Sequence, residues 1–302
     1  MTGMTPTDQR NLDDAVEKAK ALIEAHHYIR QFAGKVVVVK VGGSIMDDPH
    51  ALNRLLTDVC FMRTVSMCPV IVHGGGKAIT DAMKQAGLEA QFVQGRRYTD
   101  DRTLAIVEHV LVNEVNRPII QTISEGGHEA MGLHSLGSCV LFGKRLFLPG
   151  ENDRRIDIGF VGEVERVNAE LLHALIRAGT IPVIAPVARD SGGGKLNINA
   201  DSAAGEVAAA MKAEKLVLVS DTHGIRTGED EDSLASSLTK PQIEQLIDKG
   251  VISAGMLPKV EACFTALAEG VNKTHIVDGR IPHSLLLEIF SRQGIGTQIV
   301  LN

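Results

Sequence analysis

A lysine sits inside a run of valines at residues 35–41, KVVVVKV, and two glycines follow it. A short β-branched run predicts a buried central strand, where a charge is costly unless it reaches an anion. We therefore expect Lys40 to face an anion at the carboxyl end of its strand, where open parallel sheets bind their ligands. Gly42 and Gly43 lack a Cβ, so their N–H groups can approach that anion closely.

A second glycine turn follows the strand predicted at residues 69–72, and its glycines are Gly74, Gly75 and Gly76. The chain contains no GxxxxGK[ST] segment, and neither turn extends to GxGxxG, so the P-loop and dinucleotide-binding signatures are both absent. Lys259 stands at the start of a predicted helix and is a second candidate cation. These features predict a phosphate site of another type.

The elements that position these residues alternate along the chain. Strand, glycine turn and helix occur twice between residues 35 and 87, a pattern typical of βαβ units. We expect a three-layer α/β/α sandwich with a central, mostly parallel sheet. Helices are predicted at 49–66, 77–87, 101–126, 168–179, 202–212, 239–249, 257–270 and 282–290. Further strands are predicted at 180–187, 215–220, 274–277 and 297–301, with short strands in 137–167 and loops at 189–201 and 226–237.

Composition narrows the function classes. Lys plus Arg is 31 and Asp plus Glu is 37, so the net charge is −6, and the chain has no Trp and only two Tyr. An acidic surface with few aromatic rings argues against nucleic-acid partners and against anionic membranes. The start of the chain lacks a secretion signal and no apolar run reaches membrane-spanning length, so we expect a cytoplasmic protein.

Metal and disulfide sites are not expected. The four cysteines are scattered with no CxxC pair, which is typical of free thiols. His128 and His134 are six residues apart, so on a helix they would lie on different faces, and we interpret that segment as a solvated, Gly-rich turn. Residues 8–32 form a predicted amphipathic helix that serves either packing or assembly.

Five motifs follow one another in order: KVGGS at 40–44, HGGG at 73–76, GRRYTD at 95–100, NINAD at 197–201 and GMLPK at 255–259. From about residue 22 to its end, the chain resembles the amino acid kinase family. The resemblance is strongest to members that use ATP to phosphorylate the side-chain carboxylate of N-acetyl-L-glutamate, giving an acyl phosphate in arginine biosynthesis. It implies three regions: an assembly helix at 1–33, a substrate-binding and dimerising lobe at 34–190 and a nucleotide-binding lobe at 191–302.

The resemblance also implies a role for each matched residue. The catalytic residues would be Lys40, Lys259 and Asp201, the carboxylate orienting the two cations. Substrate would bind at Gly75, Gly76, Arg97, Asn197 and Asn199, phosphate at Gly42, Gly43, Gly74 and Gly75, and the nucleotide at Ser220 and Asp221. The phosphates of ATP would be neutralised by Mg²⁺ without protein metal ligands. By type alone, Arg97 is equally typical of a surface ion pair and the two asparagines of turns.

The N-terminal helix resembles that of arginine-inhibited members, which form hexameric rings of dimers. Carried over, the effector site for L-arginine would comprise Tyr28, His275, Glu288 and Gly294. A homo-oligomer, dimer or hexamer, is therefore expected, and a nitrogen-sensing regulatory protein is a further candidate partner. Two alternatives stay open: a kinase of aspartate, N-acetyl-aminoadipate or UMP, and a non-catalytic amino-acid sensor.

Overall fold

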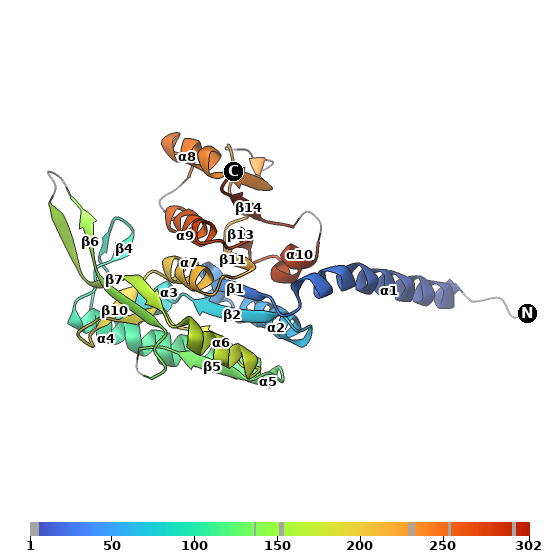
Figure 1. Ribbon diagram of the computed structural model, residues 1–302, viewed down its shortest axis with the longest axis horizontal. Helices are drawn as coiled ribbons and strands as arrows, with labels where there is room; N and C mark the ends of the chain where they lie inside the picture. Colours follow the sequence, from blue (N-terminus) through green and yellow to red (C-terminus); the bar gives the residue numbers. More distant parts are fainter. Residues whose placement is uncertain are drawn as a thin grey trace, which may run out of the picture.

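The computed structural model describes residues 6–135, 137–150, 154–228, 230, 233–252, 255–291 and 294–302. Its centre is an eight-stranded sheet (Figure 1). The strands are β1 Val36–Val41, β2 Cys68–His73, β5 Ala130–Leu133, β8 Ile181–Ile184, β11 Lys215–Ser220, β12 Ser237–Thr239, β13 Lys273–Asp278 and β14 Thr297–Val300. They lie in the order β12-β14-β13-β11-β1-β2-β8-β5, and only the β13–β14 pair is antiparallel. The predicted α/β architecture with a mostly parallel sheet is confirmed.

Helices cover both faces of this sheet. One face carries α2 Pro49–Thr64, α3 Gly76–Gln85, α4 Asp101–His109, α5 Arg117–Glu125 and α10 Ser284–Phe290. The other carries α6 Ala169–Arg177, α7 Ala200–Ala210, α8 Lys240–Asp248 and α9 Leu257–Ala268. Each helical layer buries its own apolar core against the sheet, so the sheet lies between two separate clusters of buried side chains.

Side-chain alternation along β1 decides which face Lys40 occupies. Val37 and Val39 point into the core beneath α2, whereas Val38 points into the core beneath α7. Lys40 is two residues from Val38, and residues i and i+2 of a strand share a face. The lysine therefore lies on the α7 side of the sheet, at the carboxyl end of its strand.

A second group of strands flanks the sheet. β6 Leu141–Pro149 and β7 Arg155–Val167 form a long antiparallel hairpin, which closes into a small barrel with β9 Val187–Arg189 and β10 Lys195–Ile198. A short pair, β3 Phe92–Val93 and β4 Arg96–Arg97, lies beside it. The strands of the hairpin are longer than the short strands predicted there. Residues 151–153, together with parts of the predicted loop at 226–237, lie outside the described residues.

Four predictions of secondary structure were wrong in part. The strand predicted at 180–187 is two strands, because Pro186 lies between β8 and β9 and has no N–H to donate. The predicted turn at 128–134 contains β5, which lies at the sheet edge, and the predicted loop at 189–201 contains β10. The helix predicted at 101–126 is interrupted by a π-helix, η2 Val110–Asn116. The strands β5 and β10 were not predicted because their sequences are polar or contain glycine.

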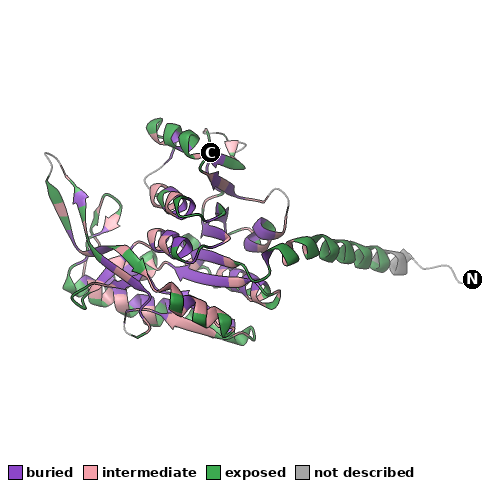
Figure 2. Cartoon of the chain, in the orientation of Figure 1, coloured by how far each residue is buried: buried purple, intermediate pink, exposed green. Residues whose placement is uncertain are grey.

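The N-terminal helix α1, Pro6–Phe32, extends away from the rest of the chain (Figure 1). From residue 11 to residue 27 its surface is almost entirely exposed (Figure 2), including four large apolar side chains: Leu12, Val16, Leu22 and Ile23. Among the described side chains of α1, only those at its end, such as Tyr28 and Phe32, pack on the rest of the chain, so the stretch that carries these four side chains gains little stability from packing. Among the helices of the described residues, none is both long and apolar enough to cross a bilayer.

Candidate active site

Two lysines from distant parts of the chain meet at one carboxylate. Lys40 Nζ lies 2.8 Å from Asp201 Oδ1, and Lys259 Nζ lies 3.2 Å from Asp201 Oδ2. Lys40 comes from the end of β1, Asp201 from the first turn of α7 and Lys259 from the first turn of α9. Packing of α7 between β1 and α9 therefore brings the three charges together.

The charge state of Asp201 follows from opposing effects. Burial raises the pKa of the carboxyl group, and the two lysines beside it lower it. The lysines prevail, so the pKa is below its ordinary value and the group is ionised at neutral pH. Asn199 fixes its position, because its side-chain oxygen caps α7 by accepting the N–H of Asp201 at 2.9 Å. The site thus holds one excess positive charge.

The first glycine turn packs closely around these groups. Gly42 lies directly under the Lys40 ammonium, and a Cβ there would collide with Nζ. Gly43 has a positive φ of 71° and opens the short 3-10 helix η1, Gly43–Asp47. Asp221 closes this turn from β11, because its carboxylate accepts the N–H of Ser44 at 3.1 Å. The positive φ of Gly43 therefore favours glycine there, whereas a side chain at position 42 would displace the Lys40 ammonium.

The second glycine turn differs from the prediction in one respect. The N–H of Gly74 donates to the Val41 carbonyl at 2.7 Å, so it is already committed within the protein. Of the two phosphate donors predicted in this turn, Gly74 and Gly75, only Gly75 therefore keeps its N–H available, and Gly76 was predicted to bind substrate. Both line a cavity of about 240 Å³ together with Lys40 and Asp201.

Arg97 enters the same cavity from β4. Its guanidinium is nearly buried and donates to the Gly76 carbonyl at 2.9 Å and to Thr80 Oγ1 at 2.8 Å, with the Phe92 ring 4.9 Å away. Within the described residues no carboxylate pairs with it, so it is not the surface ion pair that its type alone would suggest. Burial lowers its pKa, yet an arginine remains charged. A buried cation that holds only neutral partners is suited to bind an incoming carboxylate.

The two predicted asparagines line this cavity as well. Asn197 lies on β10 and donates to Thr99 Oγ1 at 3.1 Å. Asn199 follows the end of that strand and caps α7. Neither is only a turn residue, because both line the cavity that Arg97 and Lys40 also line.

The residues predicted to bind the nucleotide lie at the end of β11. Ser220 is buried, and Asp221 lines a cavity of about 470 Å³ that also includes His223 and Arg280. Asp278 orders this region by accepting from Arg280 at 2.7 Å and contacting His223 at 2.8 Å. A larger cavity, about 670 Å³, opens beside Gly43 and Gly75 toward α2 and α5, and no sequence pattern indicated it.

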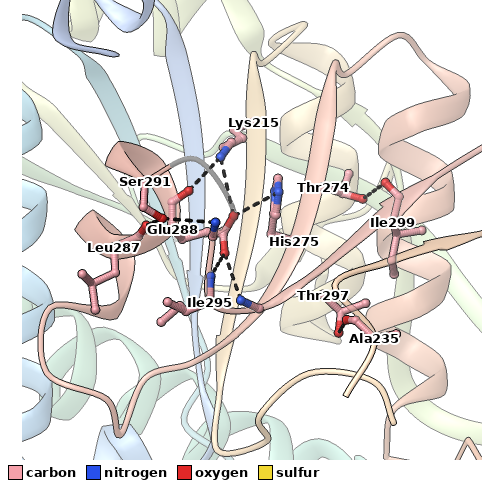
Figure 3. A network of polar contacts seen from close by, with 12 residues as sticks. Lys215, Ala235, Thr274, His275, Leu287, Glu288, Ser291, Ile295, Thr297 and Ile299 are labelled. Carbon is pink, nitrogen blue, oxygen red and sulfur yellow. Dashed lines mark hydrogen bonds and ion pairs between the residues drawn. The ribbon is translucent and has the colours of Figure 1, made fainter. Parts of the chain in front are cut away.

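The four predicted effector residues line a cavity of their own, about 110 Å³, between α1 and α10. Figure 3 shows its centre, the buried Glu288 carboxylate. It accepts the N–H groups of Ile295 at 3.0 Å and Gly296 at 3.1 Å, and a Cβ on Gly294 would collide with it. Burial and two nearby lysines lower the pKa of His275 to about 3, so its ring is neutral, and its Nε2 lies 3.1 Å from the Glu288 carboxylate.

Sequence reasoning missed Lys215 in this second cavity. Its buried ammonium donates to the Glu288 carbonyl at 3.2 Å and lies 3.8 Å from the Glu288 carboxylate (Figure 3). Burial lowers the pKa of the Lys215 ammonium and Glu288 partly offsets this, so that the pKa is about 8. The sequence did contain a signal for Lys215: it is a lysine at the start of a buried apolar strand, and a lysine within such a strand was the reason for selecting Lys40.

Comparison with known proteins places the chain in a family. Residues 35–278 match the model of the amino acid kinase family. The chain belongs to the amino acid kinase family. It is 44% identical to an acetylglutamate kinase of Symbiobacterium thermophilum over 288 residues, covering 95% of this chain and 98% of that protein. It is 47% identical to an acetylglutamate kinase of Pelotomaculum thermopropionicum, with 94% and 98% covered. The resemblance inferred from the five motifs is confirmed, and the protein is a kinase.

Solved structures support the fold. N-acetylglutamate synthase from Neisseria gonorrhoeae, complexed with coenzyme A and N-acetyl-glutamate, superposes with a TM-score of 0.83 at 23% identity, covering 94% of this chain. This kinase spans 63% of the length of that synthase. Isopentenyl phosphate kinase gives a TM-score of 0.63 at 18% identity, covering 88% of this chain and all of that one. Both likenesses concern the fold alone.

Proposed function

We propose that this kinase transfers the γ-phosphoryl group of ATP to the side-chain carboxylate of N-acetyl-L-glutamate, a step of arginine biosynthesis. Sequence identity of 44–47% to acetylglutamate kinases over nearly their whole length supports the substrate. The observation that carries the proposal is the meeting of Lys40 and Lys259 at Asp201, beside a buried arginine without a carboxylate partner among the described residues.

In this mechanism the two lysines act on the transferred phosphoryl group. Phosphoryl transfer needs little covalent help, so alignment and neutralisation of charge provide most of the catalysis. Lys40 and Lys259 would hold the phosphoryl oxygens while Asp201 keeps both ammonium groups in position. The N–H groups of Gly75 and the first glycine turn would donate to the same oxygens. No general base is needed, because a carboxylate acceptor is already ionised at neutral pH.

The substrate would lie in the cavity of about 240 Å³. Arg97 would bind its α-carboxylate, replacing water with a charged partner inside a buried pocket. Asn197 would donate an amide N–H to the same α-carboxylate, and Asn199 would line the site beside it. The side-chain carboxylate would then point toward the lysines.

ATP would bind across the carboxyl end of β11, near Ser220 and Asp221. Among the described residues, no group of three His, Cys, Asp or Glu side chains is suited to hold a metal ion. Mg²⁺ is held in many kinases largely by substrate phosphates and water, and we propose that it arrives with ATP. When bound there it would neutralise phosphate charge alongside the two lysines, while Ser220 and Asp221 would align the nucleotide.

A panel of acceptors tests the activity. The purified enzyme with ATP and Mg²⁺ is given N-acetyl-L-glutamate, aspartate, glutamate, N-acetyl-aminoadipate or UMP, and release of ADP is followed by a coupled assay. We expect kcat/KM for N-acetyl-L-glutamate to exceed the others by at least a hundredfold. Preference for aspartate or UMP would replace this assignment with another kinase, and no turnover of any acceptor would favour a sensor.

We also propose that L-arginine inhibits the enzyme from the cavity between α1 and α10. The buried Glu288 carboxylate suits a guanidinium group, and Lys215 suits an α-carboxylate. Tyr28 closes the cavity from α1, stacking edge-on against Phe290 with 6.5 Å between ring centroids. Assays with millimolar arginine test this: unchanged rate and unchanged affinity for both substrates would refute it.

The exposed apolar residues of α1 support a homo-oligomer. Leu22 and Ile23 are 69% and 74% exposed, and a second copy of α1 would bury them. Sedimentation of the wild type and of the Leu22→Glu variant measures this. We expect the variant to form smaller particles; equal size for both would contradict assembly through α1.

A further inference from the structure

His73, the last residue of β2, stands directly before the second glycine turn and is fully buried. Both nitrogens of its ring are engaged. Nδ1 lies 2.9 Å from the Gly74 carbonyl, and Nε2 lies 2.9 Å from the side-chain amide nitrogen of Asn116. Because a carbonyl oxygen only accepts, the hydrogen must be on Nδ1, and Nε2 accepts from Asn116.

The amide of Asn116 has one allowed orientation. The nitrogen that donates to His73 also donates to the Val183 carbonyl on β8 at 3.0 Å. Its oxygen faces Gly132 on β5, where a Cβ would collide with it. Rotation of the amide would place its oxygen against the carbonyl of Val183, two acceptors facing each other. Asn116 therefore sets the tautomer of His73.

The ring of His73 is neutral at neutral pH. Burial lowers its pKa to about 4, outweighing the hydrogen bond to Gly74. A neutral ring with its hydrogen on Nδ1 satisfies every neighbour named above, whereas a charged ring would direct a second N–H at the Asn116 amide.

The π-helix explains how Asn116 reaches this place. Leu111 and Asn116 are five residues apart, which in an α-helix separates two side chains by about 140°. The i to i+5 hydrogen bonding of η2 widens the helical turn, so five residues overshoot one turn by less than in an α-helix and the two side chains lie closer to one face. Leu111 packs on the same glycine turn, where a Cβ on Gly75 would lie 2.7 Å from Leu111 Cδ2.

The peptide group between Gly74 and Gly75 connects the orientation of His73 with the phosphate site. The carbonyl of Gly74 and the N–H of Gly75 belong to the same planar trans peptide and point in opposite directions. Holding the Gly74 oxygen at His73 therefore directs the Gly75 N–H away from that histidine. The N–H of Gly74 donates a hydrogen bond to the carbonyl of Val41, so the peptide group before Gly74 is held as well. We propose that Asn116, acting through His73, is a positioning residue that aims the Gly75 N–H at the transferred phosphoryl group.

This inference rests on the proposed role of Gly75 in phosphoryl transfer. Asn116→Ala and Asn116→Asp remove the donor, and Asn113→Ala is the matched control, because Asn113 is the same residue type in the same π-helix but exposed and bonded to His109. With N-acetyl-L-glutamate and ATP, we expect kcat of both Asn116 variants to fall at least tenfold, with each KM within threefold of wild type. The control should keep wild-type constants.

An unchanged kcat in a folded Asn116 variant, or a loss confined to KM, would overturn the proposal. The tautomer of His73 in the wild-type enzyme gives a second readout by ¹⁵N nuclear magnetic resonance. We expect the hydrogen on Nδ1; a hydrogen on Nε2 would overturn the proposal even if the variants fail to fold. Failure of the proposed function looks different, since wild type would then not phosphorylate N-acetyl-L-glutamate at all.

Discussion

Asp201→Asn removes the charge that holds the two lysines while keeping the shape of the side chain. At an effective dielectric constant of about 20, the separations of 2.8 and 3.2 Å correspond to roughly 6 and 5 kcal/mol of attraction. Desolvation offsets most of this, and removal of one partner from a buried pair typically costs about 3–5 kcal/mol. If about 3 kcal/mol appears in the transition state as lost alignment, kcat falls about a hundredfold.

The assay is steady-state ADP release with both substrates varied. We expect the KM for ATP to stay within threefold, because the released ammonium groups still attract the nucleotide. Asp157→Asn is the control: its carboxylate is 58% exposed and pairs with Arg145 at 2.9 Å, so its loss should cost under about 1 kcal/mol and leave kcat unchanged. A lowered melting temperature with unchanged kcat in Asp201→Asn would refute the positioning role.

Three further predictions concern other parts of the molecule. The Arg97→Lys variant cannot bind a carboxylate through two parallel hydrogen bonds, so we expect the KM for N-acetyl-L-glutamate to rise about tenfold with a smaller change in kcat. An unaltered KM would show that Arg97 does not bind the substrate. Glu288→Gln should raise the arginine concentration for half-inhibition more than tenfold, measured by titration of the rate, and an unchanged midpoint would contradict the effector site. The stability that neutral His73 provides is fully present above its ordinary pKa and is lost as pH falls toward its folded value of about 4. Between pH 7.5 and 4.5 the wild type should therefore lose about 2 kcal/mol more unfolding free energy than His73→Gln, measured in urea; equal losses would contradict a buried neutral ring.

The catalytic half of the site could be predicted because its signals are local. A lysine within a run of valines avoids a large desolvation cost only where it reaches an anion at the end of its strand. The alternation of side chains along β1 then decides on which face of the sheet Lys40 lies. The glycines that follow it and Arg97 line one cavity with it, while their roles in binding stay predictions. What the sequence could not provide is the pairing of β1 with α7 and α9, which depends on the order of strands in the sheet.

The remaining differences have physical causes. β10 reads KLNI after a glycine loop, and β5 contains glycine, so tertiary pairing outweighed weak strand propensity at both. The π-helix has no signature in local composition, and only the neighbours of Asn116 on β2, β5 and β8 show why it is there. The bond between Gly74 and Val41 likewise depends on two strands lying side by side.

The central claim is that Lys40 and its partners place phosphate on the side-chain carboxylate of N-acetyl-L-glutamate. Hydroxylamine converts an acyl phosphate into a hydroxamate, which can be measured by colour and located by mass spectrometry. Wild type should form one hydroxamate on the side chain for each ADP released, and Lys40→Ala should form it at least about a hundredfold more slowly. ADP released without hydroxamate, or equal rates for both proteins, would contradict the account.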